Sequence, residues 1–108
     1  MRAMTDAIQA SKLRWVYTER NGNPFAEKHF LTVANAFYLA TKGGGAFFGN
    51  VGSFEKGYEF DAVILDDEPL ADFIPRSLSD RFQRVLWRHS EETIGAKYIQ
   101  GKRVYTQN

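Results

Sequence analysis

The stretch GSFEKGYEFDAVILD, at residues 52–66, decides the fold class of this chain of 108 residues. Its second half holds four consecutive apolar residues, AVIL, which follow Phe60 and Asp61. A short apolar run bounded by polar residues is typical of a β-strand that is buried on both faces. We therefore expect a strand at residues 60–65 that ends at the acidic residues 66–68 and at Pro69.

The region upstream of this strand is unusual in composition. Residues 37–60 contain six of the nine glycines of the chain and seven of its aromatic residues. Glycine lets the backbone turn tightly and approach aromatic rings, whereas disordered segments are poor in aromatics. We expect tight turns here, with the aromatic side chains at positions 47, 48, 54 and 58 packed in a core.

Two helices are expected before this region. Residues 3–18 carry a broad apolar face at helical spacing, and the turn-forming residues 21–24 end this helix. A connector at residues 25–30 leads to Thr32, the expected N-cap of a helix over residues 32–42. That helix presents Ala34, Phe37, Tyr38 and Thr41 at helical spacing. Gly43 is the expected stop, after which the glycines either break the chain or open a short helix.

A helix and a hairpin are expected after the strand. Ser77 and Asp80 form a capping pair ahead of a helix at residues 78–88. Residues 96–100 and 103–106 are rich in strand-forming side chains and flank Gly101-Lys102, which suits a type II′ turn. The order of helices and strands predicts an α+β fold in one domain, which would expose roughly 6,100 Å² if it were compact.

Composition excludes several classes of protein. The 14 Lys and Arg residues balance 13 Asp and Glu residues, so a strongly basic nucleic-acid-binding surface is not expected. The chain has no cysteine, which excludes disulfides and thiolate sites. No apolar run is long enough to span a membrane, and no signal peptide is recognisable at the start. A soluble cytoplasmic protein is the expectation.

No group of residues has the spacing of a catalytic, cofactor-binding or metal site. The two histidines, His29 and His89, have no second histidine within helical reach, and Glu92 is expected beyond the helix that precedes it. The serines are explained by caps, turns or helix faces, and no G-x-S-x-G motif is present. The glycine cluster lacks the phosphate-binding patterns, and the acidic run 66–68 lacks the spacing of a calcium loop. The sequence thus predicts no catalytic, cofactor-binding or metal-ligating residue.

Three motifs resemble segments near the C-terminus of amidohydrolase-superfamily enzymes. Residues 52–66 resemble the superfamily's G-x-x-x-x-G turn, its Ala-Asp or Phe-Asp pair and its buried strand that ends in Asp. ATKGGGA at residues 40–46 is similar to its A-T-x-G-G-A helix junction, and YIQGKRV at residues 98–104 is similar to its final hairpin. Within the superfamily the guanine deaminases are most similar, through MTDAI at residues 4–8, FYLATK, FFG and FDA. HSEETI at residues 89–94 departs from their G-D-D-R-N-I segment.

The resemblance implies a tail rather than a whole enzyme. Residues 1–50 would be the terminal helical segment of a (β/α)₈ barrel, and residues 51–108 would be part of a companion β-sandwich, the two forming one compact unit. Such a barrel takes roughly 200–400 residues. The family hydrolyses guanine to xanthine and ammonia with zinc held by an H-x-H pair, two further histidines and an aspartate. None of these residues matches a position here, so the resemblance implies a structural segment that does not catalyse alone.

Two other functions stay open from the sequence. The chain would be a free-standing interaction module that self-associates, because three strands alone leave unpaired edges. The aromatic and glycine-rich turn would otherwise bind a small ligand, which the fluorescence of Trp15 and Trp87 could report. The expected partner is a second copy or the missing barrel, and neither nucleic acid nor a membrane.

Overall fold

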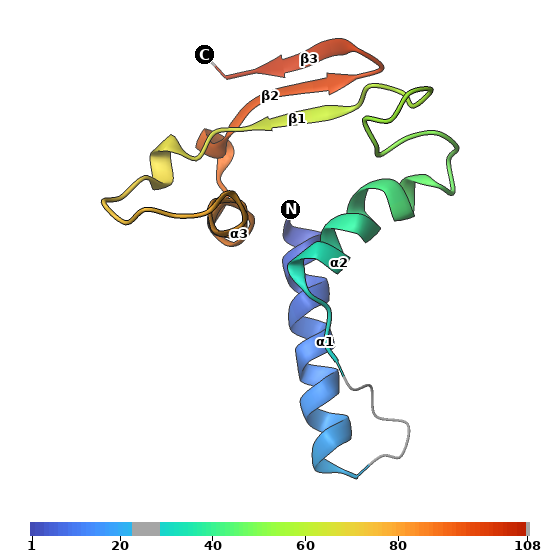
Figure 1. Ribbon diagram of the computed structural model, residues 1–108, viewed down its shortest axis with the longest axis vertical. Helices are drawn as coiled ribbons and strands as arrows, with labels where there is room; N and C mark the ends of the chain where they lie inside the picture. Colours follow the sequence, from blue (N-terminus) through green and yellow to red (C-terminus); the bar gives the residue numbers. More distant parts are fainter. Residues whose placement is uncertain (23–28, 108) are drawn as a thin grey trace.

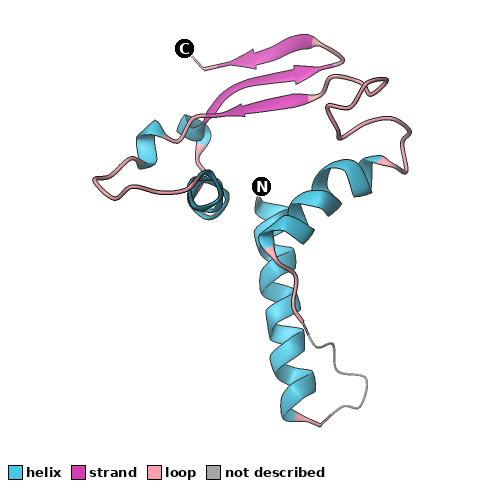
Figure 2. Cartoon of the chain, viewed as in Figure 1, coloured by secondary structure: helices cyan, strands magenta, loops and turns pink. Residues whose placement is uncertain are grey.

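The strands lie together in one sheet at one end of the molecule and the longer helices lie away from it, as Figure 2 shows, although α3 comes between β1 and β2 in the sequence. The computed structural model describes residues 1–22 and 29–107. Within those residues lie helices α1 (Arg2–Arg20), α2 (Val33–Tyr38) and α3 (Leu78–Arg88), and strands β1 (Ala62–Leu65), β2 (Ile94–Ile99) and β3 (Lys102–Thr106). The expected α+β class is confirmed.

Helix α1 contains the helix that the sequence predicts and is slightly longer at both ends. It is followed by a turn in which Gly22 has a φ of +58°, a backbone conformation that favours glycine. The rest of the expected turn and most of the connector, residues 23–28, lie outside the described residues.

Helix α2 begins as the sequence predicts but continues differently. The Thr32 hydroxyl accepts a hydrogen bond from the Asn35 N–H at 3.1 Å, and the Asn35 side chain accepts one from the Thr32 N–H in return. The expected stop at Gly43 is wrong: the backbone kinks at Thr41, whose φ of −123° and ψ of −106° are not helical, and helical backbone then continues through Gly44. The expected apolar face is wrong as well: Ala36 is the buried residue, whereas Phe37 and Tyr38 are largely exposed.

Helix α3 is predicted correctly at both ends because its signals are local. The Ser77 hydroxyl accepts a hydrogen bond from the Asp80 N–H at 3.1 Å and donates to the Asp80 carboxylate at 2.7 Å. Val85 and Leu86 are buried, and Arg88 stands in the last turn, where a cation suits the helix dipole.

The three strands form an antiparallel sheet in the order β1-β2-β3. Ala62 pairs with Tyr98 and Ile64 with Ala96, and Ala96 in turn pairs with Thr106. The expected type II′ turn is wrong. Gln100 and Gly101 both have positive φ, +50° and +76°, so they are the central pair of a type I′-like turn, whose twist matches that of the strands.

The Phe-Asp pair before β1 holds this hairpin turn in place. The Gly101 N–H donates to the Phe60 carbonyl at 2.8 Å, and the Gln100 N–H donates to the Asp61 carboxylate at 2.8 Å. The Phe60 ring lies 5.9 Å from the ring of Tyr98 and 5.7 Å from that of Phe54. The motif therefore joins β1 to the tip of the β2–β3 hairpin.

The chain has an open shape, which Figure 1 shows plainly. Helix α1 projects away from the sheet, and a small core of Ile8, Ala36 and Leu86 joins the three helices. The radius of gyration is 16.8 Å, compared with about 13 Å for a compact domain of this length. The accessible surface is 8502 Å², against the roughly 6,100 Å² expected from the chain's mass.

Two expectations about burial are wrong for this chain. The strand that reads as buried on both faces has Val63 and Ile64 exposed by 55% and 51%. The aromatics expected in the core are largely exposed at Phe47, Phe48 and Phe54. Adjacent strand residues point to opposite faces, so β1 lacks a full cover on either side of the sheet. The division into segments 1–50 and 51–108 stays a prediction.

Candidate functional site

The histidines and serines form no catalytic constellation. His29 is exposed, and the Nδ1 atom of His89 lies 3.0 Å from the Leu86 carbonyl at the end of α3. Ser11 accepts a hydrogen bond from the Leu31 N–H, and Ser77 caps α3. Across the described residues, no group of three or more His, Cys, Asp or Glu side chains is arranged to hold a metal ion.

The glycine-rich turn is built for close backbone packing. Gly52 has a φ of +81°, and a Cβ atom added there would lie 2.3 Å from the Thr41 carbonyl oxygen. Lys42 Nζ lies 2.5 Å from Glu55, whose carboxylate also accepts a hydrogen bond from Ser53. The contact with Lys42, and to a smaller extent the one with Ser53, lowers the pKa of Glu55. Glu55 in turn raises the pKa of Lys42. The cation of Lys42 is thus neutralised by the turn itself, which does not form a phosphate cradle.

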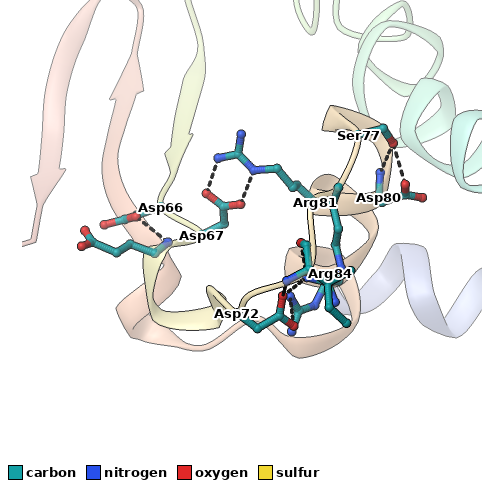
Figure 3. A network of polar contacts seen from close by, with 10 residues as sticks. Asp66, Asp67, Asp72, Ser77, Asp80, Arg81 and Arg84 are labelled. Carbon is teal, nitrogen blue, oxygen red and sulfur yellow. Dashed lines mark hydrogen bonds and ion pairs between the residues drawn. The ribbon is translucent and has the colours of Figure 1, made fainter.

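A network of ion pairs lies where β1 leads toward α3, and Figure 3 shows it from close by. Arg81 on α3 binds Asp67 in a two-pronged contact, with donor distances of 2.6 and 2.7 Å. Asp72 binds Arg76 and also lies 3.1 Å from Arg84. The Asp66 carboxylate accepts from the Glu68 N–H at 2.9 Å. The acidic run is therefore tied to α3 at Asp67 and is not merely solvated.

We call the ion pairs of Asp67 with Arg81 and of Asp72 with Arg76 and Arg84 the clamp, and their electrostatics indicate a structural role. The hydrogen bond from Arg76 and the charge of Arg84 lower the pKa of Asp72 to about 2, and Arg81 lowers the pKa of Asp67. The arginines and acids around the adjacent 290 Å³ hollow balance in number: Arg76, Arg81 and Arg84 with Asp67, Glu68 and Asp72. Strongly ionised carboxylates beside paired guanidiniums do not exchange protons near neutral pH, so the network is unsuited to acid–base chemistry.

The clamp fixes a loop with an apolar surface. Between the two clamped aspartates and the cap of α3, Phe73 is wholly exposed and Ile74 is mostly exposed. The Ile74 N–H donates to Asp72 at 3.1 Å, and Arg76 donates to the Ile74 carbonyl at 3.3 Å. Apolar side chains held rigidly in solvent are typical of surfaces that contact another part of a protein.

A second hollow is an apolar groove between α1–α2 and α3, with a volume of about 800 Å³. We call it the helical groove and define it by its main apolar lining residues: Ile8, Phe30, Phe37, Leu78, Phe82 and Trp87. The Phe37 and Phe82 rings meet edge to face at 5.3 Å, which holds the two sides of the groove together. Figure 1 shows α3 end-on beside the N-terminal end of α1 and beside α2.

Sequence reasoning missed both the clamp and the groove. Asp67 and Arg81 are 14 residues apart, and no local pattern joins them. The basic residues at 76, 81 and 84 follow an acidic run at 66–68, which is the one signal that could have suggested pairing. The groove joins residues from both ends of the chain, so it appears only in the folded arrangement.

Comparisons with known proteins identify relatives of this arrangement. No model of a protein family matches the chain. A guanine deaminase of Dictyostelium discoideum is 30% identical over 111 residues, which covers 96% of this chain and 23% of that protein. The crystal structure of the guanine deaminase from C. acetobutylicum, with bound guanine in its active site, matches with 37% identity and a TM-score of 0.80. The match covers 94% of this chain and 23% of that one.

The chain thus spans less than a quarter of the length of the relatives that it matches. The open backbone arrangement thus matches a segment of a longer enzyme at a TM-score of 0.80. By sequence and by structure, the chain resembles the C-terminal segment of guanine deaminases.

Proposed function

We propose that the chain acts as the structural C-terminal segment of a guanine deaminase-like hydrolase and contributes no catalytic group. The parent reaction would convert guanine and water to xanthine and ammonia. The observation that carries the proposal is the match at a TM-score of 0.80 to under a quarter of a guanine deaminase, in an arrangement with a large uncovered apolar surface.

The metal of the parent enzyme, which we propose to be zinc, does not fit the described residues of this chain. Asp67 is occupied by Arg81, Asp72 by Arg76 and Arg84, and His89 lies against the Leu86 carbonyl. A hydrolytic metal site needs three or four ligands that converge with one position left open. We therefore place the metal ligands in the part of such an enzyme that lies outside the matched segment.

The direct test is a guanine hydrolysis assay on the isolated chain with added zinc. We expect no xanthine above the rate without protein, because no group of three or more described His, Asp or Glu side chains is arranged to hold a metal ion. The guanine deaminase of C. acetobutylicum under the same conditions is the positive control. Xanthine production that a chelator abolishes would contradict the proposal.

Self-association is the second candidate function, and the exposed strand residues Val63 and Ile64 favour it. A chain on its own would cover these surfaces with a second copy. Analytical ultracentrifugation separates the two candidates. A stable, saturable dimer that fails to associate with the barrel portion of a guanine deaminase would favour the interaction module. We propose no nucleic-acid or membrane partner; the described residues include no helix long and apolar enough to cross a membrane.

A further inference from the structure

The helical groove is a wide hollow of about 800 Å³, and the exposure of its lining residues indicates that it is left uncovered. Leu78 is exposed by 78%, Phe37 by 46% and Trp87 by 41%, although all three face the same hollow. Apolar side chains that line a groove and remain half exposed would gain favourable free energy if a partner covered them.

The chemistry of the lining favours an apolar occupant. Lys12 is the charged residue of the lining, and its ammonium lies 5.2 Å from the centre of the Phe30 ring. The remaining polar lining residues, Thr32, Ser79 and Gln83, are uncharged. A volume of about 800 Å³ between helices with aromatic ridges suits the side chains of one face of a further helix.

The area left uncovered indicates how large the partner is. The chain exposes about 2,400 Å² more than a compact protein of its mass. If a partner covered that area with an equal area of its own, the interface would bury roughly 4,800 Å² in total, which is in the range of obligate interfaces. A small molecule is too small to cover such an area.

The comparison with solved structures indicates which partner it is. The open arrangement of this chain recurs, at a TM-score of 0.80, inside a guanine deaminase more than four times as long. The shape is therefore one that exists with the remainder of that enzyme present. A second copy of this chain would bring no such remainder.

We propose that the helical groove receives an apolar helix face from the part of a guanine deaminase-like enzyme that lies outside the matched segment. This inference rests on the proposed function, and it adds the surface and the kind of partner. Leu78 and Ser79, at the start of α3, lie where the entering helix makes contact. The clamp between Asp67 and Arg81 holds α3 at the required distance from β1.

The experiment co-expresses the tagged chain with the C. acetobutylicum guanine deaminase from which the matched segment has been deleted. Co-purification of the two pieces is measured. Leu78→Glu places a carboxylate in the groove, and Ser79→Trp fills it with a bulky side chain. Ile99→Glu, at the hairpin end and exposed by 56%, introduces the same charge outside the groove. Circular dichroism of each purified chain checks that α1 and α3 still form.

We expect the original chain and Ile99→Glu to retain the barrel portion, and Leu78→Glu and Ser79→Trp to retain it roughly tenfold less, as for a central interface residue. Equal retention by all three variants would overturn the inference and leave the proposed function intact. Failure of the original chain to retain the barrel portion would overturn the proposed function and this inference together. A dimer of the chain alone that only Leu78→Glu dissociates, with retention unchanged, would assign the groove to a second copy and overturn the inference.

Discussion

At the scale of single residues, Asp72 holds the loop before α3. It accepts hydrogen bonds from Arg76 and from the Ile74 N–H and pairs with Arg84, so its ionised form is favoured by folding. The clamp residues are arranged by contacts between a loop and a helix. Their chemistry is visible in the sequence, but their pairing is not.

The low pKa of Asp72 makes a prediction about acid stability. Because folding lowers this pKa from 3.8 to about 2, the ionised carboxylate stabilises the fold above pH 4. That contribution is lost as pH falls through the range from 4 to about 2. Asp72→Asn should reduce the loss of unfolding free energy over this range, as measured by urea unfolding at each pH. Asp6→Asn, on the exposed surface of α1, is the control, and an unchanged acid profile in Asp72→Asn would contradict the account.

Substitutions at two glycines in the turn before β1 can distinguish the cost of backbone strain from the cost of steric crowding. Gly52 and Gly57 both have positive φ, but only Gly52 would bring a Cβ atom against backbone, at 2.3 Å from the Thr41 oxygen. Each change to alanine should lower the unfolding free energy by about 1 kcal/mol through the unfavourable φ. Gly52→Ala should lose about 1–3 kcal/mol more, because the backbone must move. Equal losses in urea unfolding would show that the close approach does not matter.

At the scale of elements, local signals predict best. Ser77 and Asp80 begin α3 at the expected residue, because capping depends on neighbours three residues apart. A helix end is expected at Gly43, but the backbone kinks earlier, at Thr41, and then resumes a helical conformation, in a region where Gly52 closely approaches the Thr41 carbonyl. The expected hairpin turn, Gly101-Lys102, lies one residue too late, because the turn pair is Gln100-Gly101, and the Gln100 N–H donates to Asp61, which is far away in the sequence.

The Phe-Asp motif is predicted to stabilise the hairpin rather than to take part in chemistry. Asp61→Ala removes the acceptor of the Gln100 N–H and should lower the unfolding free energy by about 1 kcal/mol. Asp61→Asn keeps an acceptor oxygen and should lose less. Amide hydrogen exchange at residues 100–101 should rise in Asp61→Ala alone. Unchanged exchange there would show that this contact does not hold the turn.

At the scale of the whole molecule, the sequence predicts that the strand at residues 62–65 is buried, but the described residues leave it partly exposed. Residues 62–65 have the composition of a strand covered on both faces, but Val63 and Ile64 are half exposed. The composition therefore predicts the strand correctly, but the described residues do not provide the cover that it implies. The motifs indicate a resemblance to guanine deaminases, and the comparisons confirm that resemblance.

The open shape is itself a measurable property. Small-angle X-ray scattering of the monomer should give a backbone radius of gyration near 16.8 Å, because no described element covers the sheet or fills the helical groove. Concentration dependence is the control, since association would raise the value. A monomer near the roughly 13 Å of a compact domain would mean that the chain closes on itself.

The central claim is that this chain completes a guanine deaminase-like enzyme without supplying its chemistry. The most direct measurement is guanine hydrolysis by the C. acetobutylicum enzyme with its matched segment deleted, co-expressed with or without this chain. We expect no xanthine from either piece alone and chelator-sensitive xanthine formation from the two together. Turnover by this chain alone, or no turnover from a complex that demonstrably forms, would contradict it.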